Sequence, residues 1–222
     1  MNRKLGLGAI AGTLIASLAL VFVVTATPAV DAHSGQGAGA DKAAFHDAMR
    51  KLWEDHVVWT RQFIVSAATE SGNLADIGPT TDRLLDNQTD IGNALGQFYG
   101  EATGDAVEAL LRDHILTAAE LVAAAKAGDQ AAVEAASAAW YQNADDIATA
   151  LNSLNPKHWP LDEMKAHMRD HLDLTLEEAV ARLRGRYADD IAAYDKIHVQ
   201  ILGMADMLSD GIVAQFPAKF TR

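Results

Sequence analysis

A thirteen-residue pattern with Asp-His near its start recurs along the chain and is the strongest constraint on its fold. The copies are LLRDHILTAAELV at 110–122, MRDHLDLTLEEAV at 168–180 and, more loosely, LWEDHVVWTRQFI at 52–64. Each copy has apolar residues at helical spacing, and its histidine falls on the apolar stripe. The pattern therefore predicts three helices, each with one inward histidine. These histidines are His56, His114 and His171.

Helical periodicity continues through the rest of the chain from residue 41 onward. No run alternates apolar and polar residues with the β-branched enrichment of strands. Glycines, prolines and capping residues divide the pattern. The expected helices span residues 42–71, 80–98, 104–127, 130–153, 160–184 and 185–216. Because each amphipathic helix has to bury its stripe, we expect an all-α fold, an antiparallel bundle of up to six helices in one domain at 41–222.

The alternate helices repeat as well, which indicates duplicated helical hairpins. Asn-x-x-Asp-Ile occurs at 87–91 and again at 143–147, and the two histidine segments that follow are spaced almost equally. The segment ADDIAAYD at 188–195 echoes ADDIATAL at 144–151 and predicts a third copy with Tyr187 and Ile191 inward. A hairpin repeat of this length cannot bury its stripe alone and has to stack on its neighbours.

Glycines at positions 92, 96 and 100 lie four residues apart on the second expected helix. In a helix each costs about 1 kcal/mol relative to alanine. We expect close approach of a neighbouring helix to compensate.

The first 32 residues have the features of a secretory signal peptide. A basic start at Arg3-Lys4 precedes an apolar run, and Val30-Asp31-Ala32 fits the small-residue cleavage rule. A small-residue linker at 33–40 follows. We therefore expect an extracytoplasmic protein, with an uncleaved N-terminal membrane anchor as the alternative.

Charge and cysteine content exclude several partners and chemistries. The formal net charge is −12, and loss of residues 1–32, which carry two positive charges and one negative charge, makes it −13. Such a surface repels nucleic acid and anionic lipid. Without cysteine the chain has no disulfides, no thiolate metal site and no thiol catalysis.

The three inward histidines predict a transition-metal site as the leading hypothesis. Imidazoles from three helices with a carboxylate nearby suit zinc, copper or non-haem iron. The expected carboxylates each precede an inward-facing position on the alternate helices. They are Asp90, Asp146 and Asp190.

Accessory ligands favour copper within this hypothesis. His167 and His171 share a helix face at i and i+4, flanked by Met164 and Met168, and the last helix adds His198. Mixed histidine and methionine ligands suit copper.

Two alternatives to a shared metal site stay open. In the first, each histidine only satisfies a buried hydrogen bond to Asn87, Asn143 or an aspartate of its own hairpin, and the protein is a metal-free structural or interaction protein of the cell envelope. In the second, the bundle is a dimetal enzyme, although the chain lacks the Glu-x-x-His signature of that class.

Standard enzyme motifs are absent: there is no nucleophile elbow, phosphate-binding loop or His-Glu-x-x-His. We therefore expect a binding protein rather than an enzyme. Aromatic residues at helical spacing are typical of a core, and they also suit an apolar ligand pocket. They are Trp53, Trp59, Trp140, Tyr187 and Tyr194.

The chain also resembles a known family. The segments that carry the resemblance are LWEDHVVWTRQFIVS, DNQTDIGNALGQFYG and ILGMADMLSDGIVAQFP, together with the signal-like start. They resemble a family of small, exported, all-helical bacterial proteins that are uncharacterised. The resemblance implies export and a helical fold, and it implies no activity, ligand or site residue.

Overall fold

The computed structural model describes residues 37–69 and 72–220, and its regular structure there is entirely helical. The elements are α1 (Gly37–Ala67), α2 (Ile77–Tyr99), α3 (Glu101–Ala127), α4 (Gln130–Leu154), α5 (Leu161–Leu183), α6 (Tyr187–Gln215) and a 3₁₀ turn, η1 (Pro217–Lys219). The prediction of an all-α bundle is confirmed. The signal peptide expected at 1–32 lies outside the described residues.

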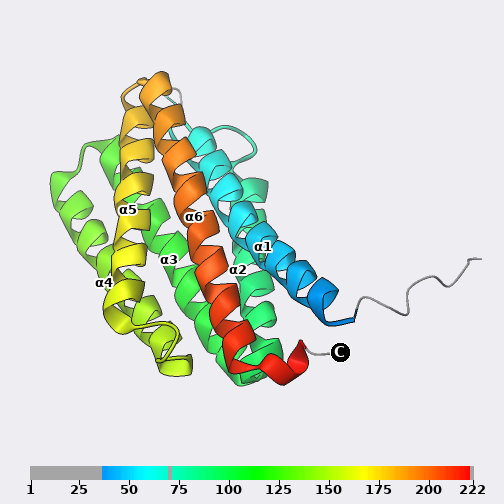
Figure 1. The fold of residues 1–222 in the computed structure, drawn as a ribbon. Helices are drawn as coiled ribbons and strands as arrows, with labels where there is room; N and C mark the ends of the chain where they lie inside the picture. Colours follow the sequence, from blue (N-terminus) through cyan, green and yellow to red (C-terminus); the bar gives the residue numbers. More distant parts are fainter. Residues whose placement is uncertain (1–36, 70–71, 221–222) are drawn as a thin grey trace, which may run out of the picture. The chain divides into compact units, whose positions relative to one another are not determined.

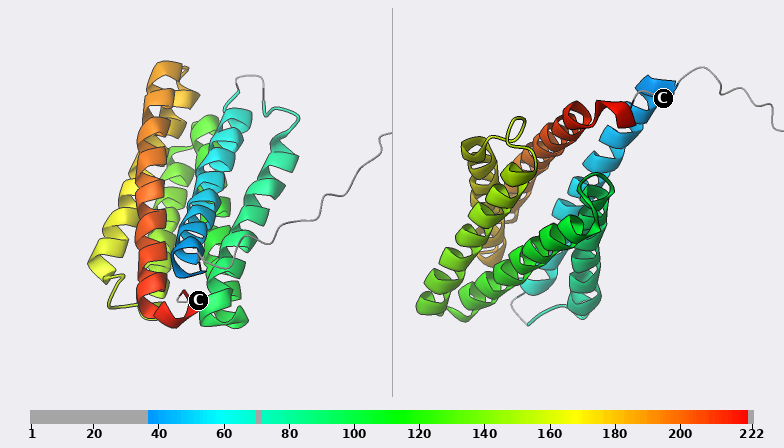
Figure 2. Two further views of the ribbon diagram at one scale, coloured as in Figure 1. Left: turned by 45° about the vertical axis from the view of Figure 1, so that its right-hand side comes forward. Right: turned by 90° about the horizontal axis from the view of Figure 1, so that it is seen from below.

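The six helices form a closed ring in which each packs on its neighbours in sequence. Helix α6 closes the ring by packing against α1 and lies between α5 and α1 in Figure 1. Helix α1 also touches α3 and α5, so the odd-numbered helices approach one another inside the ring. The α1–α2 and α5–α6 connections lie at one end of the bundle, and the α4–α5 connection and η1 lie at the other (Figure 2).

The connection between α3 and α4 is short and capped on both sides. Gly128 ends α3 in the left-handed region at φ 70°, and the Asp129 side chain then accepts a hydrogen bond from the Ala132 backbone N–H at the start of α4. Gly128 and Asp129 thus make a tight turn between α3 and α4. Helix α1 ends at Ala67 rather than the expected 71, and it begins at Gly37, within the expected linker.

Helices α2 and α3 approach closely through glycine, as the spacing on the second helix predicts. A Cβ atom on Gly104 would lie 2.6 Å from the carbonyl oxygen of Gly92, and a Cβ on Gly92 would lie 2.8 Å from the Cβ of Glu108. A Cβ on Gly96 would make only ordinary van der Waals contacts. Gly100 lies in the turn between the helices with φ 91°. Close backbone approach therefore explains Gly92 and its partner Gly104.

The α4–α5 connection is anchored on α6 by one tryptophan. Trp159 is fully buried, and its ring occupies the space that a side chain at Gly211 would fill: a Cβ there would lie 2.1 Å from the indole nitrogen. Asn155 Nδ2 donates to the Gly211 carbonyl oxygen at 2.9 Å. The α4–α5 connection thus depends on Gly211, which has no side chain to occupy the space of the Trp159 ring.

The inward face of α6 differs from the prediction. Tyr187 and Ile191, expected inward, are 57% and 54% exposed, whereas Asp190, Ala193 and Ile197 are buried. The prediction for Tyr187 and Ile191 is wrong. Among the described residues α6 is the one helix long and apolar enough to cross a membrane by length and composition, and in the bundle it packs against α1 and α5.

Two glycine substitutions on α6 test the role of Trp159. Gly211→Ala should lower the free energy of unfolding by about 2 kcal/mol or more, because an overpacked core shifts side chains and backbone. Gly203→Ala, in the same helix with no heavy atom within 4 Å of its Cβ position, should raise it by roughly 0.5–1 kcal/mol. Urea unfolding of both variants measures the difference, and equal effects would contradict this packing.

Candidate functional site

Three histidines from the odd-numbered helices lie together in the bundle interior. His56 on α1, His114 on α3 and His171 on α5 are 2%, 3% and 4% exposed, and we call them the histidine cluster. The rings of His56 and His171 have centroids 5.6 Å apart. His114 is near enough that it and His171 each disfavour a positive charge on His56. The sequence pattern thus places three imidazoles in one region.

Two of the histidines are bonded to an amide side chain of the next helix. His114 Nδ1 lies 2.8 Å from Asn143 Oδ1, and His171 Nδ1 lies 3.2 Å from Gln200 Oε1. The duplicated hairpins predict that Asn87 bonds His114 and that Asn143 bonds His171. Asn143 instead bonds His114 of the preceding helix, so the predicted pairing is wrong. The sequence pattern does not predict Gln200. Alignment of ADDIAAYD at 188–195 with ADDIATAL at 144–151 places Tyr187, not Gln200, at the position of Asn143.

The same amides also bond the backbone of the histidine helix. Asn143 Nδ2 donates to the Leu110 carbonyl oxygen at 3.0 Å, and Gln200 Nε2 donates to the His167 carbonyl oxygen at 3.0 Å. Each acceptor lies four residues before the histidine. Because the amide N–H₂ faces the carbonyl, the amide oxygen faces the ring, so Nδ1 of His114 and His171 carries the proton.

The third pair is arranged differently. Asn87 Nδ2 donates to the Leu52 carbonyl oxygen at 3.0 Å, again four residues before the histidine, His56. However, Asn87 Oδ1 accepts from Gln88 Nε2 at 3.1 Å, and His56 Nδ1 and Gln88 Oε1 are both buried without a hydrogen-bond partner. Gln88 is near enough to favour a positive charge on His56, but this ring has no hydrogen bond as well aligned as those of His114 and His171.

Burial keeps the whole histidine cluster uncharged. It lowers the pKa of His114 to about 3 and that of His171 to about 4. Burial, followed by the neighbouring His171 and His114, holds the pKa of His56 well below its usual value. Neutral imidazoles with a proton on Nδ1 present an Nε2 lone pair. No residue of the described chain bonds Nε2 of His114 or His171.

Unpaired polar atoms are concentrated around the cluster. Six buried side-chain atoms in the described residues have no hydrogen-bond partner, and besides His56 Nδ1 and Gln88 Oε1 they include the indole nitrogens of Trp53 and Trp140. The Trp53 ring lies 5.9 Å from that of His56, and the Trp140 ring 5.4 Å from that of His114. Unpaired buried polar groups of this kind call for a bound water, ion or ligand.

The expected carboxylates do not join the histidine cluster. Asp90 and Asp146 are exposed; Asp90 faces Arg83, and Asp146 accepts from Gln142 at 2.9 Å. Each aspartate directly precedes a buried isoleucine, and one residue turns a helix by about 100°. Asp90 and Asp146, expected at the bundle interior or at its boundary, therefore lie on the exposed face instead.

Asp190 is fully buried but belongs to an ionic cluster instead. Its carboxylate lies 2.7 Å from Arg61 Nη1 and 3.3 Å from Arg182 Nη1, and Arg61 also pairs with Glu178 at 2.5 Å. Burial raises the pKa of Glu178 to about 7, although the Arg61 guanidinium favours its charged form. These four residues tie α1, α5 and α6 together.

The accessory histidines also lie outside the cluster. His198 Nε2 pairs with Glu54 Oε1 at 2.9 Å on a partly exposed surface, and His167 is half-buried. Met164 and Met168 are buried in the main apolar core. In the described part of the chain, no three or more histidine, aspartate or glutamate side chains are close enough to hold a metal ion.

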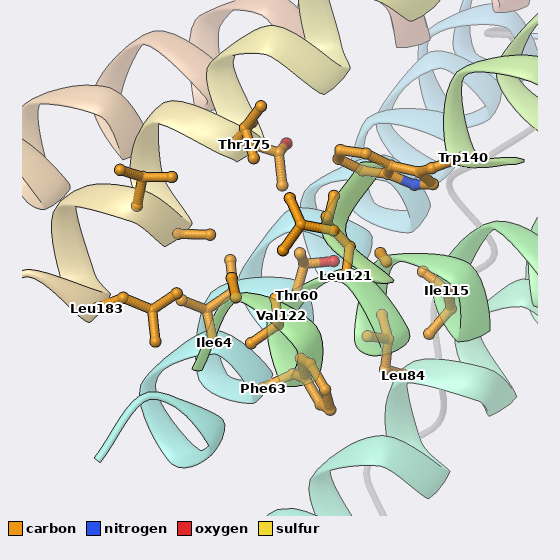
Figure 3. Close-up of a pocket in the computed structure, with 16 residues that line it drawn as sticks. Thr60, Phe63, Ile64, Leu84, Ile115, Leu121, Val122, Trp140, Thr175 and Leu183 are labelled. Atoms are coloured by element: carbon orange, nitrogen blue, oxygen red, sulfur yellow. The ribbon is translucent and has the colours of Figure 1, made fainter. Parts of the chain in front are cut away.

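An apolar cavity of about 100 Å³ lies next to the histidine cluster, between helices α1 to α5. Figure 3 shows its lining side chains, among them Thr60, Trp140 and Thr175. Thr60 and Thr175 each lie one turn after a cluster histidine, and their hydroxyls donate to the carbonyl oxygens of His56 and His171 at 2.8 Å. The cavity is therefore one helical turn from the cluster, and no charged residue lines it.

Comparison of the chain with protein-family models, with curated proteins and with solved structures gave no match. The histidine cluster and the adjoining cavity are therefore the basis for a functional proposal.

Stability should fall as the pH falls because the cluster stays neutral in the folded protein. Below about pH 6.5 the unfolded chain takes up protons on these histidines while the folded protein does not, until the pH reaches about 4 for His171 and about 3 for His114. At pH 5 each histidine should thereby reduce the free energy of unfolding by about 2 kcal/mol relative to pH 7. Urea unfolding at several pH values measures this. The slope should be smaller in His171→Asn and unchanged in His158→Ala; equal slopes in all three proteins would contradict it.

Glu178 should have the opposite pH dependence. Its pKa in the folded protein is raised to about 7, so its contribution is fully present below about pH 4.5 and is lost as the pH rises through 7. Relative to Glu178→Gln, the parent should lose on the order of 2 kcal/mol between pH 5 and pH 8. Paired urea unfolding of parent and variant at both pH values isolates this group. A difference that does not change with pH, or that grows in favour of the parent, would contradict the raised pKa.

Proposed function

We propose that this chain is an exported helical-bundle binding protein whose histidine cluster takes up a transition-metal ion. The observation that carries the proposal is the collection of unpaired polar atoms around three buried, neutral imidazoles. A buried polar group without a partner is costly. A metal ion at this place would engage His56 Nδ1 and Gln88 Oε1, whereas the indole N–H groups of Trp53 and Trp140 are donors and do not bind a cation.

The hydrogen bonds behind the rings support a metal ion as the ligand. In protein metal sites, a ligating histidine usually donates its other ring N–H to a carboxylate or carbonyl oxygen, which fixes the tautomer and ring orientation. The oxygens of Asn143 and Gln200 do this for His114 and His171. Neutral nitrogen ligands without thiolate favour zinc, copper or iron.

Metal uptake requires the three rings to move closer together, since in the described chain no three side chains are at ligand distance. His56 is the ring to move, because its Nδ1 makes no well-aligned hydrogen bond and has only the Gln88 side chain beside it. Metal–nitrogen bonds near 2.0–2.1 Å are needed for zinc. We therefore propose that ion binding orders His56 against His114 and His171.

We also propose that the bundle is built from three repeated hairpins. Asn87, Asn143 and Gln200 each donate to a carbonyl oxygen four residues before a cluster histidine, which supports this origin. Export is proposed from the signal-like residues 1–32, and kinship with the exported helical family from the segments that resemble it.

A metal-free structural protein is the second candidate. The bonds of His114 and His171 to amide side chains of the following helix favour it, because such bonds satisfy one buried ring nitrogen without any ion. A dimetal enzyme has less support, since the chain lacks the Glu-x-x-His signature and Asp90 and Asp190 lie in ion pairs.

Elemental analysis and metal titration of the untagged protein from an exporting host test the proposal. We expect about one zinc, copper or iron ion per chain, its loss in His114→Ala/His171→Ala and its retention in His158→Ala. Because the cluster pKa values lie near 3 and 4, binding should persist at pH 5, where an ordinary surface histidine is protonated.

Circular dichroism and urea unfolding establish that the double variant is folded. The metal site is ruled out by absence of metal from the folded parent after titration, or by equal metal in parent and double variant. In that case the double variant should lose stability without any loss of ligand, as the metal-free alternative predicts.

A further inference from the structure

We infer that the apolar cavity next to the histidine cluster is a binding site for a small uncharged apolar molecule, of the size of a benzene ring or a short alkyl chain. This inference does not depend on the metal site, because no cluster histidine lines the cavity. The cavity volume is about 100 Å³. An engineered apolar cavity of about 150 Å³ takes up benzene or xenon, and this cavity is about two-thirds of that volume, so the ligand is no larger than these molecules.

Small residues on three helices create the space. Ala118 on α3 lies four residues after His114, at the position that Thr60 and Thr175 occupy relative to His56 and His171. Ala179 on α5 adds a further small side chain to the wall. A larger apolar residue at any of these positions would fill the cavity and gain contacts. The open volume is thus a consequence of residue size at particular positions on regular helices.

The chemistry of the wall selects the ligand. No charged residue lines the cavity, and the hydroxyls of Thr60 and Thr175 are already bonded to their own helices. A charged or strongly polar ligand would lose its hydration without compensation. Trp140 lies at one side of the cavity in Figure 3, and the other lining side chains are apolar apart from Thr60 and Thr175. The wall therefore offers mainly dispersion contacts, beside the unpaired indole N–H of Trp140.

An entry route is present at Phe63. Phe63 and Val122 line the cavity and also line a second, more open pocket bounded by Asn73 and Lys126. Phe63 is half-buried, so its ring separates the two spaces without being locked in the core. Rotation of this ring would connect the cavity to the outer pocket.

Benzene and xenon are the probes for the test. Benzene should raise the melting temperature of the full chain in proportion to the logarithm of its concentration above the dissociation constant, and ¹²⁹Xe NMR should show a bound-state shift. Ala118→Leu, which fills the cavity, should abolish both effects. Ala192→Leu, the same change at an exposed position of α6, should retain both.

A second variant keeps the test valid if Ala118→Leu does not fold. Leu121→Ala enlarges the cavity, so its melting temperature should be lower than that of the parent and its stabilisation by larger rings such as naphthalene should be greater. The inference is overturned if neither benzene nor xenon affects the parent, or if Ala118→Leu responds as strongly as the parent. Loss of metal binding in the histidine variants has no bearing on these outcomes, so the two proposals fail separately.

Discussion

The hydrogen bonds between amide side chains and the histidine helices are the interaction on which the interior of this bundle depends. Asn143 and Gln200 each bond a ring nitrogen and a backbone carbonyl oxygen of the preceding helix. One side chain therefore fixes the register of two helices and the tautomer of a histidine together. The apolar core on either side supplies most of the stability, but apolar contacts alone are non-directional and do not specify which way a ring faces.

These bonds have electrostatic consequences. They place the proton of His114 and His171 on the side of the ring facing the next helix, and burial keeps both rings neutral. His56 does not share this arrangement, because Gln88 occupies the oxygen of Asn87. The α1–α2 pair thus leaves His56 Nδ1 and Gln88 Oε1 without a hydrogen-bond partner. In the α3–α4 and α5–α6 pairs, by contrast, Nδ1 of the histidine is hydrogen-bonded. A buried cluster whose polar groups are only partly hydrogen-bonded is typical of a site that binds a ligand.

Sequence periodicity predicts the helices and the inward histidines because burial and helical geometry are local. Periodicity fails on α6, because alignment of the repeated segment ADDIA gives the wrong register for the inward face. The same alignment does not predict Gln200, because a glutamine does not match the asparagine of the repeated motif. Periodicity also does not place Asp90 and Asp146. Each directly precedes a buried isoleucine, but a helix turns by about 100° per residue, so a neighbour of a buried residue can face the solvent. The cavity and the Arg61 ion pairs depend on distances between distant segments, which periodicity does not contain.

The histidine tautomers test the central claim most directly. Two-dimensional ¹⁵N–¹H spectra of the histidine side chains report which ring nitrogen carries the proton and whether the ring is charged. For metal-free protein between pH 7 and pH 5, this structure predicts that His114 and His171 are neutral with the proton on Nδ1. Spectra with the proton on Nε2, or with a charged ring at pH 6, would contradict it.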